Sequence, residues 1–228
     1  QLRRASFAGN EIVRVETVGA WPLLEELSLE DNRLSSMVEL AGMSRLTKLD
    51  LGKNRIARVE GLGALPALRQ LSLEDNELTT LDGVTEAAAL MELYAGGNRL
   101  LNLRDIVAMK ALSELVILDL AANPLCADTQ YRLYTVYHLG SRLKMLDGVT
   151  LESSELLAAR QAYTGKLTAD ALAERFAILG KPPHLTKVLD ISHSKLRVVD
   201  ALRHANLVAL EELNLDCNQI SDLRSLPS

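Results

Sequence analysis

The 228-residue sequence predicts an α/β solenoid, in which a short unit of chain repeats and each copy adds one strand to a parallel sheet on the concave side. Three observations predict this fold class. Leucine supplies 47 residues, about 21% of the chain, which points to internal repeats. Asparagine recurs at near-constant intervals along the first half of the chain. Apolar residues keep fixed offsets from each of these asparagines.

The spacing of the asparagines defines the repeat. They are Asn10, Asn32, Asn54, Asn76, Asn98 and Asn123, with intervals of 22, 22, 22, 22 and 25 residues. In the second copy, Leu24, Leu27 and Leu29 lie 8, 5 and 3 residues before the asparagine, and Leu34 lies two after it. Later copies keep these offsets. The pattern L-x-x-L-x-L-x-x-N-x-L is the leucine-rich repeat signature.

Each part of the repeat has a physical role. The central x-L-x-L-x alternation predicts a short strand with its leucines in the core and its other side chains on the opposite face. Stacked copies pair into a parallel sheet, because no copy alone can bury its leucines. Each asparagine amide can bond the backbone groups that the following turn buries, so we expect the asparagines to be structural. Apolar residues at about 3-residue spacing then predict a 3₁₀ turn on the outer side.

The pattern changes after Asn123. A short amphipathic helix is expected around Tyr131, Leu133, Val136, Tyr137 and Leu139, followed by a strand-like segment at 143–146. Residues 151–181 read as helix, with a threonine at 168 as a possible N-cap and two prolines ending it. The repeat then restarts. We therefore expect a repeat block with a cap at 1–150, a helical spacer at 151–183 and the start of a second block at 184–228.

Two segments give a more specific resemblance. N-P-L-C-x-D-x-x-Y-R-L-Y-x-x-Y-H-L at 123–139 and L-K-x-L-D-G at 143–148 resemble the C-terminal cap of the SDS22-like class of leucine-rich repeat proteins. A cap would cover the leucines and the sheet edge of the last copy. The order of block, cap, spacer with G-K-L-T-A-D-A-L-A-E, and second block is similar to that of the multi-block leucine-rich repeat-containing protein 9 family.

The resemblance implies a non-catalytic scaffold for protein–protein interaction, cytoplasmic and at a cilium or axoneme. The same class also contains a regulatory subunit of protein phosphatase 1 and a spliceosomal scaffold. These two functions remain the alternatives to the ciliary scaffold.

Composition argues against several other functions. The net charge of −5 and the pI near 5.5 give no basic excess for nucleic acid or an anionic membrane. Cys126 and Cys217 are too few for a zinc cluster or a disulfide framework, which favours a reducing cytosol. The four histidines lack ligand spacing, and G-K-L-T at 165–168 lacks the other residues of a phosphate loop. No apolar run is long enough to span a bilayer. We expect no enzyme activity, cofactor, metal, small-molecule substrate or membrane contact.

The outward strand positions form the candidate binding surface. Across all six copies they carry six acids and two bases, with Asp31 and Asp75 on the adjoining rim. Neighbouring strands lie about 4.8 Å apart, inside a Debye length of about 8 Å, so the charges act as one negative field. This face is expected to bind a protein partner with a basic or mixed surface, with Tyr94 as an aromatic anchor. An ordinary solvated sheet face is the alternative. The candidate residues are Glu26, Ser28, Glu30, Lys48, Asp50, Gln70, Ser72, Glu74, Glu92, Tyr94 and Asp119.

Overall fold

The computed structural model describes residues 2–15, 21–37, 40, 43–222, 224 and 226. It divides the chain into two compact units, residues 1–157 (unit 1) and 158–228 (unit 2). The division falls inside helix α3 (Ser153–Tyr163), which lies in the expected spacer. The three segments read from the sequence, with boundaries at 150 and 183, stay a prediction.

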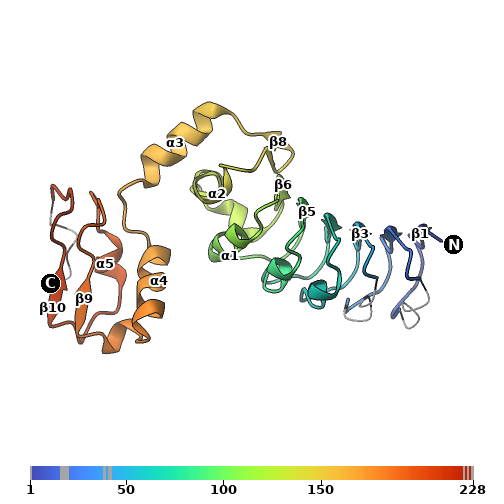
Figure 1. Cartoon of the computed structure of the whole chain (residues 1–228), viewed down its shortest axis with the longest axis horizontal. Coiled ribbons are helices and arrows are strands. Elements are labelled where there is room, and N and C mark those ends of the chain that lie inside the picture. Colours follow the sequence, from blue (N-terminus) through green and yellow to red (C-terminus); the bar gives the residue numbers. More distant parts are fainter. Residues whose placement is uncertain are drawn as a thin grey trace. The chain divides into compact units, whose positions relative to one another are not determined.

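Unit 1 is built on one sheet whose strands follow the chain in order. Seven strands run parallel and the eighth turns back antiparallel to the seventh. The strands lie along the concave edge of unit 1 and the connecting turns along the convex edge (Figure 1). The α/β solenoid is thereby confirmed. The strands are β1 (Arg4–Ser6), β2 (Glu26–Ser28), β3 (Lys48–Asp50), β4 (Gln70–Ser72), β5 (Glu92–Tyr94), β6 (Ile117–Asp119), β7 (Met145–Leu146) and β8 (Val149–Thr150).

The core of unit 1 is a column of leucines from successive strands. Leu49, Leu71 and Leu93 are the middle residues of three neighbouring strands, lie in register, and are 0% exposed. Their neighbours along each strand point to the other face and keep contact with solvent. The two-residue period therefore separates core and surface as predicted.

The asparagines form the predicted ladder. The Asn76 amide nitrogen donates to the carbonyl oxygens of Leu51 and Leu73 at 2.9 and 3.1 Å, and its Oδ1 accepts the Ile56 N–H at 2.9 Å. Each amide thus joins its own turn to the preceding copy. Asn10 is the exception. It is exposed and its amide donates within its own copy, to the carbonyls at positions 7 and 8. The buried members of the ladder are Asn32, Asn54, Asn76, Asn98 and Asn123.

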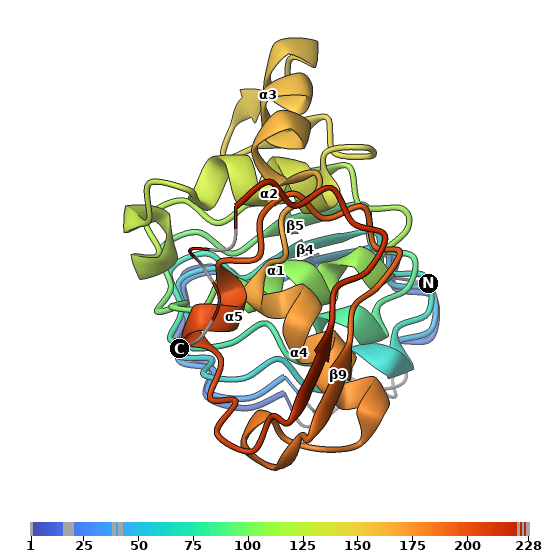
Figure 2. The same cartoon turned by 90° about the vertical axis from the view of Figure 1, so that its left-hand side faces the viewer.

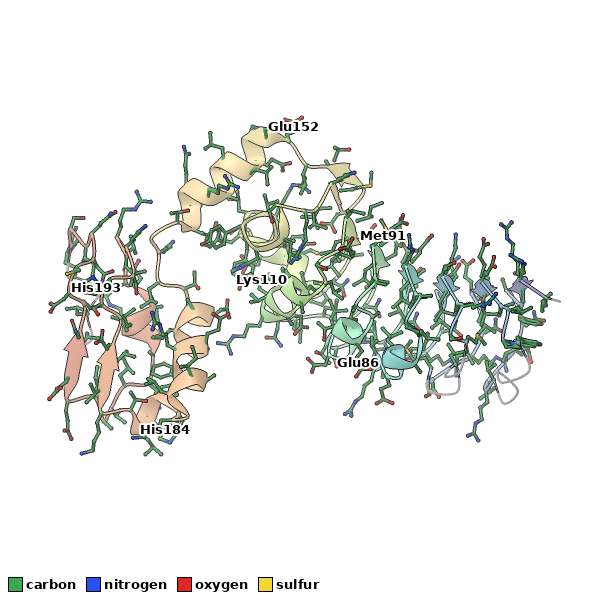
Figure 3. The ribbon with its side chains drawn as sticks, viewed as in Figure 1. Glu86, Met91, Lys110, Glu152, His184 and His193 are labelled. Carbon is green, nitrogen blue, oxygen red and sulfur yellow. The ribbon has the colours of Figure 1, made fainter. Side chains whose placement is uncertain are left out.

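The outer turns contain short 3₁₀ helices, as the 3-residue spacing predicts. They are η3 (Leu62–Ala64), η4 (Val84–Glu86) and η5 (Met109–Ala111), and the longer fifth interval adds α1 (Arg104–Ala108). Glu86 lies on this convex side (Figure 3), where its carboxylate accepts the Gly63 N–H at 3.1 Å. The convex side therefore also has contacts between copies.

The end of the first block is covered by η6 (Pro124–Ala127), α2 (Tyr131–Leu139) and the β7–β8 hairpin. Asp147 and Gly148 have φ of 52° and 73°, which suits a two-residue type I′ turn. The Asp147 carboxylate accepts the Leu120 N–H and the Tyr131 O–H, each at 2.9 Å. One carboxylate thus joins the turn to the last copy and to α2.

The buried face of the α2 helix differs from the expected face at one tyrosine. Tyr131, Val136 and Leu139 are buried as expected, but Tyr137 is 36% exposed and Tyr134 is buried in its place. Arg132 on the same helix pairs with Glu155 at 2.6 Å. The cap is therefore held by polar contacts as well as by apolar packing.

The segment expected to be helical, 151–181, contains two helices, α3 and α4 (Ala169–Leu179), with a break at 164–168. The threonine expected as an N-cap precedes the second helix. Gly165 at φ 75° turns the chain, and Thr168 caps α4 by accepting the Ala171 N–H at 3.2 Å. Gly180, also at positive φ, ends α4.

Unit 2 continues with η7 (Pro183–Leu185), β9 (Val188–Asp190), α5 (Ala201–His204) and β10 (Glu212–Asn214), and its two strands pair in parallel. Helix α4 lies beside β9 (Figures 1 and 2), and Leu172 and Phe176 share a core with Leu189 and Ile191. Asn218 donates to the carbonyls of residues 191 and 215 at 2.9 and 2.8 Å, as the asparagines of unit 1 do. The repeat therefore restarts in unit 2.

Candidate protein-binding surface

The sheet register arranges the candidate residues in rows across the concave face. The strand positions form two rows, and Glu30 and Glu74 lie just beyond the ends of β2 and β4. All eleven candidates are therefore gathered on one surface, whose binding role stays a prediction. The first row is Glu26, Lys48, Gln70 and Glu92, and the second is Ser28, Asp50, Ser72, Tyr94 and Asp119.

Charges over the first strands are largely paired. Arg4 contacts Glu26 at 3.1 Å, and Lys53 contacts Glu30 at 2.7 Å. A recess of about 450 Å³ lies over these strands and is lined by basic and acidic side chains, including Arg4, Glu26 and Lys48. This part of the surface is mixed in charge rather than uniformly acidic.

Several acidic side chains lie close together toward β6. Partial burial raises the pKa of Glu74, and the carboxylates of Asp119, Asp75 and Asp50 raise it further. Among the residues that the structure describes, no ion pair involves Glu74, Glu92 or Asp119. We call the surface formed by Glu74, Glu92, Tyr94 and Asp119 the acidic patch.

Tyr94 lies within the acidic patch. Its hydroxyl donates to the Glu92 carboxylate at 3.0 Å. Burial, that hydrogen bond and the nearby charges of Glu74 and Asp119 raise the pKa of Tyr94 to about 12, so the phenol is neutral at physiological pH. An aromatic ring beside several carboxylates suits a lysine or arginine side chain, which can contact the ring face and pair with an acid.

The role of Lys53 was not predicted from the sequence. This residue lies directly before Asn54, at the position that Asp31 and Asp75 occupy in neighbouring copies, and has φ of 52°. Its side chain reaches back to Glu30 in the preceding copy. A comparison of the copies at this position reveals the change of charge, but not the direction in which the side chain points.

The described part of the chain contains no helix long and apolar enough to cross a membrane, and no group of three His, Cys, Asp or Glu side chains placed to hold a metal ion. Cys126 is half-buried, and its thiol donates to the Leu120 carbonyl at 3.1 Å. Burial raises the pKa of that thiol, which suits a structural cysteine better than a reactive one.

Comparison with known proteins identifies the family. The family model described as leucine-rich repeat matches residues 48–177, more than half of the chain. The chain belongs to the leucine-rich repeat family. Leucine-rich repeat proteins generally mediate protein–protein interaction, and the fold is typically a non-enzymatic scaffold.

Solved leucine-rich repeat structures resemble this one. A chain of the Drosophila melanogaster SNF/U2A′ complex is 26% identical with a TM-score of 0.51, and the match covers 75% of this chain and 87% of that one. Listeria monocytogenes internalin C2 is 23% identical with a TM-score of 0.53, over 62% of this chain and 58% of its own. Listeria internalin F is 17% identical with a TM-score of 0.53, over 98% and 70%. The internalins show a shared fold alone.

Proposed function

We propose that this leucine-rich repeat protein is a non-catalytic scaffold that binds a basic segment of a protein partner on its concave face. The observation that supports the proposal is the acidic patch, where unpaired carboxylates surround Tyr94 on neighbouring strands. Long-range attraction to the carboxylates would raise the association rate, and Tyr94 would anchor the bound segment.

The proposed subfamily is the SDS22-like class, and the proposed setting is the cytoplasm, at a cilium or axoneme. Both rest on the sequence of the cap and on the order of block, cap, spacer and second block. The proposed partner is a protein rather than nucleic acid, membrane or a small molecule, because the net charge is −5 and the carboxylates would repel phosphate groups.

Affinity capture from an extract of ciliated cells tests the proposal. The baits are the wild-type chain and a variant with Glu26, Glu30, Glu74 and Glu92 all changed to Lys, after circular dichroism has shown that both fold. Axonemal or dynein proteins that bind the wild type and are lost with the variant would support it. A partner held equally by both baits would contradict binding through this face. Capture of protein phosphatase 1 would instead favour a regulatory subunit.

A spliceosomal scaffold is the second candidate function. The similarity to a chain of the SNF/U2A′ complex favours it, because the match covers 87% of that chain at 26% identity. Under this alternative the same capture would recover spliceosomal proteins, and the extract of a cell type without cilia would serve equally well as the source. If no spliceosomal protein is recovered from such an extract, the result would argue against the spliceosomal function.

A further inference from the structure

Unit 2 has a groove between α4 and the outward side of β9. None of the residues that line this groove belongs to the acidic patch. Its volume is about 490 Å³, within the range of about 300–1,000 Å³ typical of ligand pockets. We call it the α4 groove. The residues that carry the argument are Arg175, Ile178, Leu179, Lys181, Lys187 and Val188.

Three aliphatic side chains of the α4 groove are open to solvent. Ile178 is 81% exposed, Leu179 46% and Val188 53%. Helix α4 already packs through Leu172 and Phe176, so Ile178 is not needed to hold it in place. In unit 1 the first residues of β4 and β5 are polar, whereas β6 begins with isoleucine and β9 with valine. In unit 2 this aliphatic strand position lies beside the exposed aliphatic end of α4.

The rim of the α4 groove is mainly basic. Lys187 pairs with Glu211 at 2.6 Å. Arg175 contacts the Ser194 hydroxyl at 3.4 Å, and within the described ranges neither Arg175 nor Lys181 has an ion pair. Among the described residues that line the groove, Asp190 is the one acid, and it accepts hydrogen bonds from the Ser192 backbone N–H at 2.8 Å and the Asn214 amide at 3.2 Å. The charge of Arg175 also acts on Asp190 and helps to lower its pKa. Lys181, together with Arg175 in part, is thus left to attract an acidic ligand.

We propose that the α4 groove binds an acidic peptide segment of a partner protein, with an aliphatic side chain inserted between Ile178 and Val188. Carboxylates on the same segment would pair with Arg175 and Lys181. This preference is opposite in charge to that of the acidic patch. A ligand for one surface therefore should not compete for the other.

Selection of random twelve-residue peptides on the full chain tests the proposal. Fluorescence anisotropy then measures each recovered peptide against wild type, Ile178→Glu, and Arg175→Glu combined with Lys181→Glu. Val208→Glu is the matched control, because Val208 is 82% exposed in the same unit and does not line the groove.

We expect a class of acidic peptides with aliphatic residues. Their affinity should fall at least about tenfold in the I178E and R175E/K181E variants, because each loses apolar burial or charge pairing, and stay unchanged in V208E. Recovery of no acidic class, or equal affinity for wild type and I178E, would overturn the proposal. A wild-type chain that dimerises while I178E stays monomeric would also overturn it, by assigning the groove to a second copy.

Discussion

At the residue scale, the asparagine ladder is the clearest stabilising feature of unit 1. Asn76→Ala leaves the buried Ile56 N–H without its acceptor. The carbonyl oxygens of Leu51 and Leu73 each keep the amide of a neighbouring asparagine as a donor. We expect this change to lower the free energy of unfolding in urea by about 1–3 kcal/mol, the cost of one unsatisfied buried group. Asn10→Ala is the control and should cost less than about 0.5 kcal/mol, because Asn10 is exposed. Equal losses of stability in N76A and N10A would contradict the claim that the buried asparagine amide stabilises the fold.

Glu74 gives a residue-scale prediction with a pH dependence. Its pKa is raised above the ordinary value of 4.5, so its ionised form destabilises the folded state. Glu74→Gln should raise the melting temperature at pH 7. The gain should shrink as the pH falls through the raised pKa and vanish below 4.5, where the carboxyl is protonated in both states. Glu30→Gln breaks the ion pair with Lys53 and should give no such gain. A pH-independent effect of E74Q would show that the charge is not its cause.

At the scale of the element, the cap depends on the Asp147 carboxylate. Asp147→Ala removes the acceptor of the Leu120 N–H and the Tyr131 O–H and places alanine at φ of 52°. We expect a loss of about 3 kcal/mol in the free energy of unfolding. Asp147→Asn keeps an acceptor oxygen and tolerates positive φ, so its loss should be much smaller. If urea unfolding gives equal losses for D147A and D147N, the carboxylate oxygens do not hold the cap.

The elements also show how far the sequence predicts the structure. The strands, the ladder, the outer 3₁₀ turns and the cap were predictable, because a 22-residue period fixes which residues face inward. The start of α4 was predictable from Thr168 as an N-cap, but the end of α3 was not, since the apolar spacing continues to Leu167 while Gly165 turns the chain. The pairing of Lys53 with Glu30 could not be predicted, because it depends on the direction in which the Lys53 side chain reaches to the preceding copy. The α4 groove requires α4 to lie beside β9, which spacing along one segment does not determine.

At the scale of the whole molecule, each unit has its own hydrophobic core. Phe176 packs with Leu172 and Leu189 in unit 2, so Phe176→Ala should destabilise that unit by about 3–5 kcal/mol. Hydrogen exchange should then become faster over residues 185–215 and stay unchanged over residues 46–120. Faster exchange in both ranges would show that the two units unfold as one. The conservative variant Phe176→Leu should leave both ranges close to wild type.

The most direct measurement of the central claim is the affinity of a captured partner for two charge-reversal variants of unit 1. One carries Glu74→Lys and Glu92→Lys in the acidic patch. The other carries Glu60→Lys and Glu114→Lys, two exposed positions outside the concave strands, and so has the same net charge. The account predicts that E74K/E92K weakens binding at least about tenfold while E60K/E114K binds nearly as wild type. Equal loss in both variants would show that only net charge matters. Full binding by E74K/E92K would contradict the claim that the acidic patch is the binding site.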